Sequence, residues 1–395
     1  MKKITALALV FNMIFLTGCW DSREINELGL VMAVGVDKKK GSGIYTVTAQ
    51  IAKPSSASGQ GGKSGGGDQP VWVGSAEGKT IFEAIRNLAK FSSRRIMWAH
   101  NNIIIIGESL AEEDITPVVD FFTENPELRM KTWVAIAHGD AKPFIAAKTG
   151  MENIPGISMA ELFRYHQLPA ESVATDMLNL FRDYKSETIQ PLVSALTLKT
   201  ENSPGGSNQV ELEGAAVFQG AKLVGWVSPE ETRGLAWVRN EMKNAIIVTS
   251  GVGKEKQNLS VELKGARAKV AAQVTGEIPS ITIDVTAKGD ISEIDSPTDM
   301  AMSELKAKVE EESVHVIKRE IKLGLEKVQK QYKCDVLGFG RAVHIANKDL
   351  WYKNMADKWE DVYPQVPVII NVSVNIESGA LFQEPTNIEK KSGKD

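Results

Sequence analysis

The stretch "VPVIINVSVNIESG", residues 366–379, is the clearest structural signal in the chain. Its apolar residues occupy every second position, which is the pattern of a β-strand with one buried face and one solvent-facing side. Two other long strand-like stretches precede it, "LSVELKGARAKVAAQV" and "SITIDVTAKGDISEI". Together they predict a C-terminal α+β domain over residues 258–383, followed by a polar tail, residues 384–395, that we expect to be frayed.

A long helix is predicted inside this domain, over residues 297–332. Ser296 is a good N-cap, Pro297 fits the first turn, and Asp299 lies near the positive end of the helix dipole. Apolar residues then recur at helical spacing, so one face of the helix should pack on the sheet.

The N-terminal part, residues 19–199, also mixes strand and helix patterns. "LGLVMAVGVD" and "IYTVTAQI" alternate and predict a hairpin, and the Gly/Ser-rich residues 54–70 predict a flexible loop. Thr80 and Glu83 form a capping-box pattern before a helix. The apolar stretch "RIMWAHNNIIIIG" is predicted to be one central strand of an α+β domain.

The sequence "ENSPGG" marks a predicted boundary after residue 199. A small middle α+β domain is predicted over residues 200–257, with two strands, a helix from Ser228 through Met242, and a further strand. The predicted fold class is therefore α+β, with three mixed sheet-plus-helix domains whose sheets are mostly antiparallel or mixed.

The charge balance excludes some classes of partner. The chain of 395 residues has a formal net charge of −4, and removing residues 1–18 leaves 44 basic and 50 acidic side chains, a net charge of −6. A mildly acidic protein is poorly suited to neutralising nucleic-acid phosphates, or to holding anionic lipid by charge alone. We therefore expect no nucleic-acid partner.

The amino terminus carries a targeting signal. "MKK" followed by "ITALALVFNMIFLT" has the positive and apolar regions of a signal peptide, and is too short for a transmembrane helix. The next residues, "LTGC" at 16–19, resemble the bacterial lipobox, whose cysteine thiol receives a diacylglyceryl group before cleavage. We predict that residues 1–18 are a lipoprotein signal peptide and that Cys19 is the lipid attachment site, so that the chain is membrane-anchored without spanning the bilayer.

Four residues directly after Cys19 are candidates for contact with lipid headgroups or a partner protein: Trp20, Asp21, Arg23 and Glu24. An indole suits the membrane interface, because its ring is apolar and its N–H is polar. Packing of Trp20 inside the first domain is an equally good interpretation.

A search for catalytic motifs finds only incomplete ones. "GGKS", residues 61–64, lacks the first glycine of a phosphate-binding loop, and "GISMA", residues 156–160, lacks the last glycine of a nucleophile elbow. The five histidines are scattered, and Cys334 is expected to be a small buried apolar residue. We predict no catalytic residues, no metal and no cofactor, and therefore no enzyme.

Several stretches carry a resemblance to a known family. They are "CWDSREINELGLVMAVGVD", "HNNIIIIGESLAEE", "VVDFFTENPELRMKTWVAIAHGDAK", "GAAVFQGAKLVGWVSPEETRGLAWV", "DVLGFGRAVHIANKDLW" and "DKWEDVYPQV". They resemble the Ger(x)C lipoproteins, the C subunits of spore nutrient-germinant receptors, from the lipobox to about Gly379. One departure is Glu124, where that family usually has Arg.

The resemblance implies a non-enzymatic, lipid-anchored subunit on the outer face of the cell membrane, which in spores is the inner spore membrane. It implies a multi-span A-type subunit and a permease-like B-type subunit as partners, in a complex that supports nutrient-triggered germination.

Two other classes of protein are alternatives. A solute-binding lipoprotein would capture a nutrient itself, but such proteins usually have two lobes of alternating βαβ units, which the predicted hairpins and single helices do not suggest. A lipid-anchored hydrolase would need a pocket that holds a nucleophile and a base.

Overall fold

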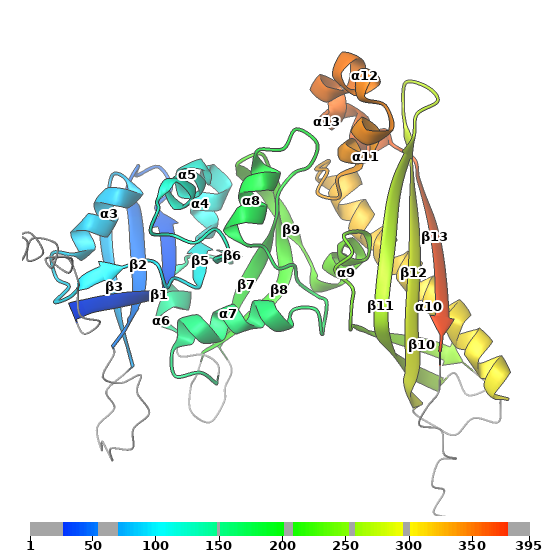
Figure 1. Ribbon diagram of the computed structural model, residues 1–395, viewed down its shortest axis with the longest axis horizontal. Helices are drawn as coiled ribbons and strands as arrows, with labels where there is room; N and C mark the ends of the chain where they lie inside the picture. The colour runs from blue at the N-terminus through cyan, green and yellow to red at the C-terminus, as the bar shows by residue number, and fades with distance from the viewer. Residues whose placement is uncertain are drawn as a thin grey trace, which may run out of the picture.

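A computed structural model of the chain describes residues 27–53, 70–147, 151–200, 208–252, 257–294 and 301–377. These residues form an elongated body with two β-sheets arranged along its long axis (Figure 1). Their mixture of sheets and helices confirms the predicted α+β class. The predicted signal peptide, residues 54–69 of the predicted loop and the predicted frayed tail lie outside the described residues.

Nine strands of the described chain form the first sheet. They are β1 (Leu28–Lys38), β2 (Tyr45–Ala52), β3 (Val71–Gly78), β4 (Arg95–Met97), β5 (Ile103–Ile106), β6 (Trp133–Ala137), β7 (Leu192–Thr200), β8 (Asn208–Gln219) and β9 (Lys222–Val227). Their order is β3-β2-β1-β5-β6-β7-β8-β9, with β4 paired to β1. The central strands β1, β5, β6 and β7 run parallel, and antiparallel strands extend the sheet on both sides.

Helices cover both faces of this sheet. They are α3 (Ile81–Leu88), α4 (Glu108–Glu113), α5 (Thr116–Glu124), α6 (Lys142–Ala146), α7 (Pro155–Tyr165) and α8 (Met177–Tyr184). In β5, Ile104 and Ile106 join the core with α3, α4, α5 and α8, whereas Ile103 and Ile105 join the core with α6 and α7. Figure 1 shows these two groups of helices on opposite sides of the sheet. A strand that is buried on both faces is apolar at every position, which explains the run of four isoleucines.

The stretch "RIMWAHNNIIIIG" forms two strands, β4 and β5, where the sequence predicts one. Between them the chain turns, and the backbone N–H of Asn101 donates to the carbonyl of Trp98 at 3.0 Å. Both strands pair in parallel with β1, β4 near its start and β5 further along. The sequence patterns did not predict this turn, because its residues include neither glycine nor proline.

The second sheet contains β10 (Ile246–Val252), β11 (Gln257–Gln273), β12 (Ser280–Ile294) and β13 (Val368–Ile376), in that order. The stretch at residues 366–379 supplies β13, which pairs in parallel with β12, while the other pairs are antiparallel. Val374 and Ile376 are buried and Asn375 between them is exposed. The predicted half-buried strand is thereby confirmed.

The predicted long helix corresponds to α10 (Met302–Leu325), which continues as a π-helical turn (Glu326–Gln331). The helical region therefore ends at residue 331, one residue before the predicted end. Residues 297–300 lie outside the described residues, but the predicted start is wrong, because Ala301 has an extended backbone and is the N-cap of a helix that begins at Met302. Leu305, Val309 and Ile317 of α10 are buried in the core that the helix shares with the second sheet.

The residues predicted as a middle domain, 200–257, have no sheet of their own among the described residues. β8 and β9 complete the first sheet, whereas β10 begins the second. Between them lies α9 (Pro229–Val238), which Ser228 and Glu231 cap in a full capping box. Because strand partners are chosen by burial and non-local pairing, the composition change at "ENSPGG" does not mark a sheet boundary.

Short helices close the C-terminal part before β13. They are α11 (Phe339–Ala346), α12 (Lys348–Leu350), a π-helical turn (Trp351–Met355), a 3₁₀ turn (Ala356–Lys358), α13 (Trp359–Val362) and a second 3₁₀ turn (Tyr363–Gln365). The buried carboxylate of Asp335 joins two of them, because it accepts hydrogen bonds from the backbone N–H groups of Phe339 and Gly340 and from Trp359 Nε1, at 3.0, 2.7 and 2.9 Å. Burial raises its pKa.

Cys334 precedes this carboxylate and is 2% exposed, as expected for a small buried apolar residue. Burial, with a smaller contribution from Glu360 and Asp335, raises the pKa of its thiol from 9.0 to about 12. Because the thiolate is the reactive form, the native thiolate population at about pH 8 should be about 1000-fold smaller than that of the unfolded chain.

We therefore expect iodoacetamide to alkylate Cys334 very slowly in the native protein and rapidly in denaturant. Mass spectrometry of the peptide that contains Cys334, sampled over time, measures both rates. Native alkylation at the rate of the denatured chain would contradict the buried position.

Candidate functional site

The five residues that the sequence predicts for lipid attachment or contact, Cys19, Trp20, Asp21, Arg23 and Glu24, lie outside the described residues. The described chain begins at Glu27, immediately before β1. The start of β1 is therefore the described position nearest in sequence to the predicted lipid attachment site, and its surroundings are the candidate functional site.

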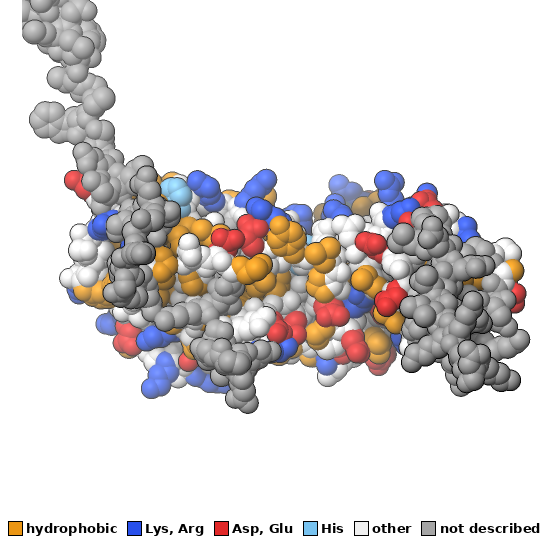
Figure 2. Space-filling model, turned by 90° about the horizontal axis from the view of Figure 1, so that it is seen from below, with side chains coloured by type: hydrophobic (Ala, Val, Ile, Leu, Met, Phe, Trp, Pro, Cys, Tyr) orange, Lys and Arg blue, Asp and Glu red, His pale blue; other side chains and the backbone are white. Residues whose placement is uncertain are grey.

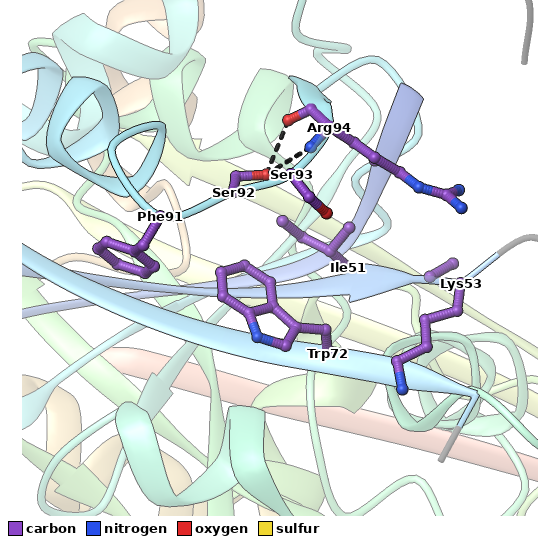
Figure 3. Close-up of a pocket in the computed structure, with 9 residues that line it drawn as sticks. Ile51, Lys53, Trp72, Phe91, Ser92, Ser93 and Arg94 are labelled. Carbon is purple, nitrogen blue, oxygen red and sulfur yellow. Dashed lines mark hydrogen bonds between the residues drawn. The ribbon is translucent and has the colours of Figure 1, made fainter. Parts of the chain in front are cut away.

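A pocket of about 260 Å³ lies beside the start of β1 (Figure 3). Four segments build it: β1, the end of β2, the start of β3, and the loop between α3 and β4. Its lining residues are Gly29, Ile51, Ala52, Lys53, Trp72, Phe91, Ser92, Ser93 and Arg94. Gly29 allows close packing on Ile51, because a Cβ there would lie 3.0 Å from Ile51 Cγ2, a tight contact that this side chain would have to relieve.

Aromatic and cationic side chains occupy different sides of this pocket. Figure 3 shows the rings of Trp72 and Phe91 on one side of Ile51, and the side chains of Lys53 and Arg94 on the other. The two rings meet edge to face, with centroids 5.9 Å apart and planes at 63°. Phe91 is 53% exposed, so part of this apolar surface faces solvent.

The loop that carries Arg94 is held by the hydroxyl of Ser92, which donates to the Arg94 carbonyl at 2.7 Å and accepts from the Arg94 N–H at 3.4 Å. The Nη1 atom of Arg94 is buried and has no hydrogen-bond partner among the described residues. The exposed ring of Phe91, together with the partly exposed cationic side chain of Arg94 in the same pocket, is suited to binding an anionic or amphipathic surface.

The lining residues of this pocket are mainly apolar, aromatic, hydroxyl-bearing and cationic. Its described lining includes no histidine, cysteine or carboxylate. Across the described chain, no group of three or more His, Cys, Asp or Glu residues is placed to hold a metal ion. On the face in Figure 2, acidic and basic side chains are interspersed with apolar ones.

The incomplete motifs of the sequence do not form a site among the described residues. "GISMA" lies within α7, where Ser158 is buried, and "GGKS" lies outside the described residues. His138 stacks on Trp226 with ring centroids 3.7 Å apart, whereas His100 is exposed in the turn before β5. Among the described residues, no helix combines the length and apolar character that crossing a bilayer requires.

Sequence reasoning did not find the pocket beside β1. Its residues come from four separate segments, and no single segment has an unusual pattern. The only local signal is the pairing of exposed aromatic residues with nearby basic ones, which is common on protein surfaces.

Comparisons with known proteins match nearly the whole chain. Two family models match in order: "Spore germination protein N-terminal domain" over residues 21–198 and "Spore germination B3/GerAC like, C-terminal" over residues 213–379. Spore germination protein KC of Bacillus subtilis (strain 168) is 27% identical over 402 residues, which cover 97% of each chain. The putative spore germination protein YfkR of the same organism is 29% identical over 377 residues, which cover 93% of this chain and 94% of the relative.

A solved structure, the crystal structure of the GerBC protein, has a similar fold. The TM-score is 0.54 at 19% sequence identity, over 87% of this chain and 97% of that chain. At this identity the likeness concerns the fold alone.

Proposed function

Because this chain belongs to the spore germination B3/GerAC-like family, we propose that it is a lipid-anchored, non-enzymatic subunit of a spore germinant receptor, supporting nutrient-triggered germination. The observation that carries the proposal is the position of the family matches. They begin at residue 21, two residues after the predicted lipid attachment site, and continue through both sheets to residue 379.

The length of chain after Cys19 limits the distance between the body and the bilayer. The nine residues that follow Cys19, up to Leu28, reach at most about 30 Å when fully extended. The pocket beside the start of β1 would then lie close to the membrane surface. Its exposed Phe91, with Trp72 and Arg94, suits the headgroup region, where aromatic and cationic side chains are both favourable.

In this arrangement the pocket beside β1 contacts lipid headgroups or a membrane-embedded partner. The partners are a multi-span A-type subunit and a permease-like B-type subunit. The site of action is the outer face of the cell membrane, which in spores is the inner spore membrane. Attachment to the same bilayer raises the effective concentration of each partner for the others.

Direct nutrient capture, as by a solute-binding lipoprotein, is the alternative function. Such a protein would need two lobes of alternating βαβ units around a ligand cleft. Here the first sheet has hairpins at both edges and the second is largely antiparallel, which favours the subunit role.

Two experiments test the proposal: deletion of the gene that encodes the chain, and co-purification of the chain with its partners. Spores that lack it should lose most of their germination response to the nutrient of this receptor, and the wild-type gene supplied in trans should restore the response. A tagged full chain, extracted from spore membranes in detergent, should co-purify with the A-type and B-type subunits. A chain that purifies alone, from spores whose germination does not depend on it, would contradict the proposal.

A further inference from the structure

A second pocket, of about 460 Å³, lies at the amino-terminal ends of β5 and β6, against the end of α7. This volume is in the range of pockets that bind small molecules. None of the residues considered for the lipid anchor or for the pocket beside β1 contributes to it.

The unusual group in this second pocket is Asn101. The residue is 4% exposed, and its backbone is satisfied: the N–H donates to the Trp98 carbonyl, and the carbonyl accepts from Thr132 Oγ1 at 3.1 Å. Its side-chain amide is not satisfied, because neither Oδ1 nor Nδ2 has a hydrogen-bond partner among the described residues. Buried polar groups are nearly always paired, and Asn101 lines the pocket, so a molecule bound there is the candidate partner for this donor and acceptor.

The charges around Asn101 indicate the class of that ligand. Arg129, Lys131 and Arg164 line the pocket, with Glu161 as its single acidic side chain among the described residues. Glu161 pairs with Arg164 at 3.0 Å, while neither Arg129 nor Lys131 forms an ion pair within the described chain. The lining therefore has an excess of positive charge, which favours an anion.

An apolar wall completes the pocket. The rings of Trp133 and Phe163 are stacked, with centroids 5.1 Å apart and planes at 16°. Phe163 is buried, so the half-buried ring of Trp133 is the part of this pair that faces the pocket. A bare inorganic anion would leave this ring unused, whereas an organic molecule can contact it through its carbon skeleton while its polar groups reach Asn101.

We propose that this pocket binds a small organic carboxylate. Arg129 and Lys131 attract the carboxylate, the amide of Asn101 binds a second polar group of the ligand, and the carbon skeleton packs on the ring of Trp133, which Phe163 supports from behind. The inference goes beyond the proposed receptor role and does not depend on it, since the pocket needs neither a lipid anchor nor a partner subunit.

Calorimetric titration of the full chain in detergent tests the proposal with defined probes: L-alanine, L-lactate, succinate, benzoate, their neutral amides and inorganic phosphate. We expect at least one carboxylate to bind with a Kd of about 1 mM or less, and its amide to bind at least about tenfold more weakly. Absence of binding by every carboxylate would overturn the proposal. So would tighter binding of phosphate, which would indicate an inorganic-anion site.

Two variants and a control separate binding from folding. Asn101→Leu should abolish binding yet raise Tm by about 2–4 °C, because it removes an unpaired buried amide. Arg129→Gln should weaken carboxylate binding about tenfold or more without lowering Tm. Arg86→Gln, on the exposed face of α3, is the matched control and should bind as wild type. Unchanged affinity in Asn101→Leu would contradict the assigned role of the amide.

Discussion

Replacing Cys19 by alanine should release the mature chain from the membrane and abolish its contribution to nutrient-triggered germination. The reason is that the thiol is the only atom to which the diacylglyceryl group can be attached at this position. Each buried methylene contributes about 0.8 kcal/mol, so two acyl chains anchor firmly where one chain gives only marginal binding. Without them, a body with a net charge of −6 has no electrostatic attraction to an anionic bilayer.

Membrane fractionation, mass spectrometry of the mature amino terminus and a germination assay measure this prediction together. Cys334→Ala is the matched control, because it removes the other cysteine of the chain from a buried position and should leave membrane attachment unchanged. Normal germination by a soluble Cys19→Ala chain would show that tethering is not the mechanism. A wild-type chain without an acyl group at Cys19 would refute the anchor itself.

Gly234→Ala should destabilise the protein by about 3 kcal/mol, although alanine is normally the better helix former. Gly234 lies in α9 where this helix crosses α10. A Cβ at this position would lie 2.0 Å from the Glu320 carbonyl oxygen and 3.1 Å from the Gly324 backbone nitrogen. These are backbone atoms of a long helix, so the clash can be relieved only by moving one helix away from the other.

The same movement would break the polar contacts between α9 and α10. The carboxylate of Glu320 accepts from Arg233 Nε at 3.0 Å and from Trp237 Nε1 at 2.7 Å. Arg233 also donates to the carbonyls of Pro169 and Ile246, at 2.7 and 3.0 Å. This one guanidinium therefore connects the loop after α7, α10 and the first strand of the second sheet, so separation of the helices would loosen the contact between the two sheets.

The midpoint of urea unfolding, followed by far-UV circular dichroism, measures the effect. Gly276→Ala is the matched control, because a Cβ there meets no heavy atom within 4 Å; its midpoint should change little. If both variants unfold at the same urea concentration, the contact between α9 and α10 does not stabilise the fold as argued.

The junction between the sheets has a second contact that sequence reasoning did not find. Tyr332 reaches from the end of the helical region to β9, where its hydroxyl donates to the Trp226 carbonyl at 2.8 Å and accepts from the Trp226 N–H at 3.1 Å. A Cβ at the neighbouring Gly225 would lie 2.4 Å from that hydroxyl oxygen. In the sequence, Tyr332 is only one of several apolar positions of a long helix, since nothing local distinguishes a residue that faces another sheet.

Local patterns predicted several elements correctly because they act over a few residues. Thr80 caps α3 as predicted, with its hydroxyl accepting from the Glu83 N–H at 3.1 Å, but the Glu83 carboxylate accepts from the Lys79 N–H at 2.8 Å, so the box is not reciprocal. The helix buries Ile81, Ile85 and Leu88 as the spacing indicates. The helix predicted from Ser228 through Met242 also forms, but it ends at Val238, short of the predicted end. The residue at which a helix ends is hard to predict from sequence, because the last turn depends on what it packs against.

By itself, therefore, the sequence determined the α+β class, the strand that ends the second sheet, and the lipobox-like signal on which the proposed anchoring depends. These follow from side-chain periodicity and from short contiguous motifs, which need no knowledge of distant neighbours. Only the tertiary structure decided which sheet each strand joins and where the pockets lie. Strand pairing and the burial of a polar group such as Asn101 depend on segments far apart in the chain, and no local pattern records which of them meet.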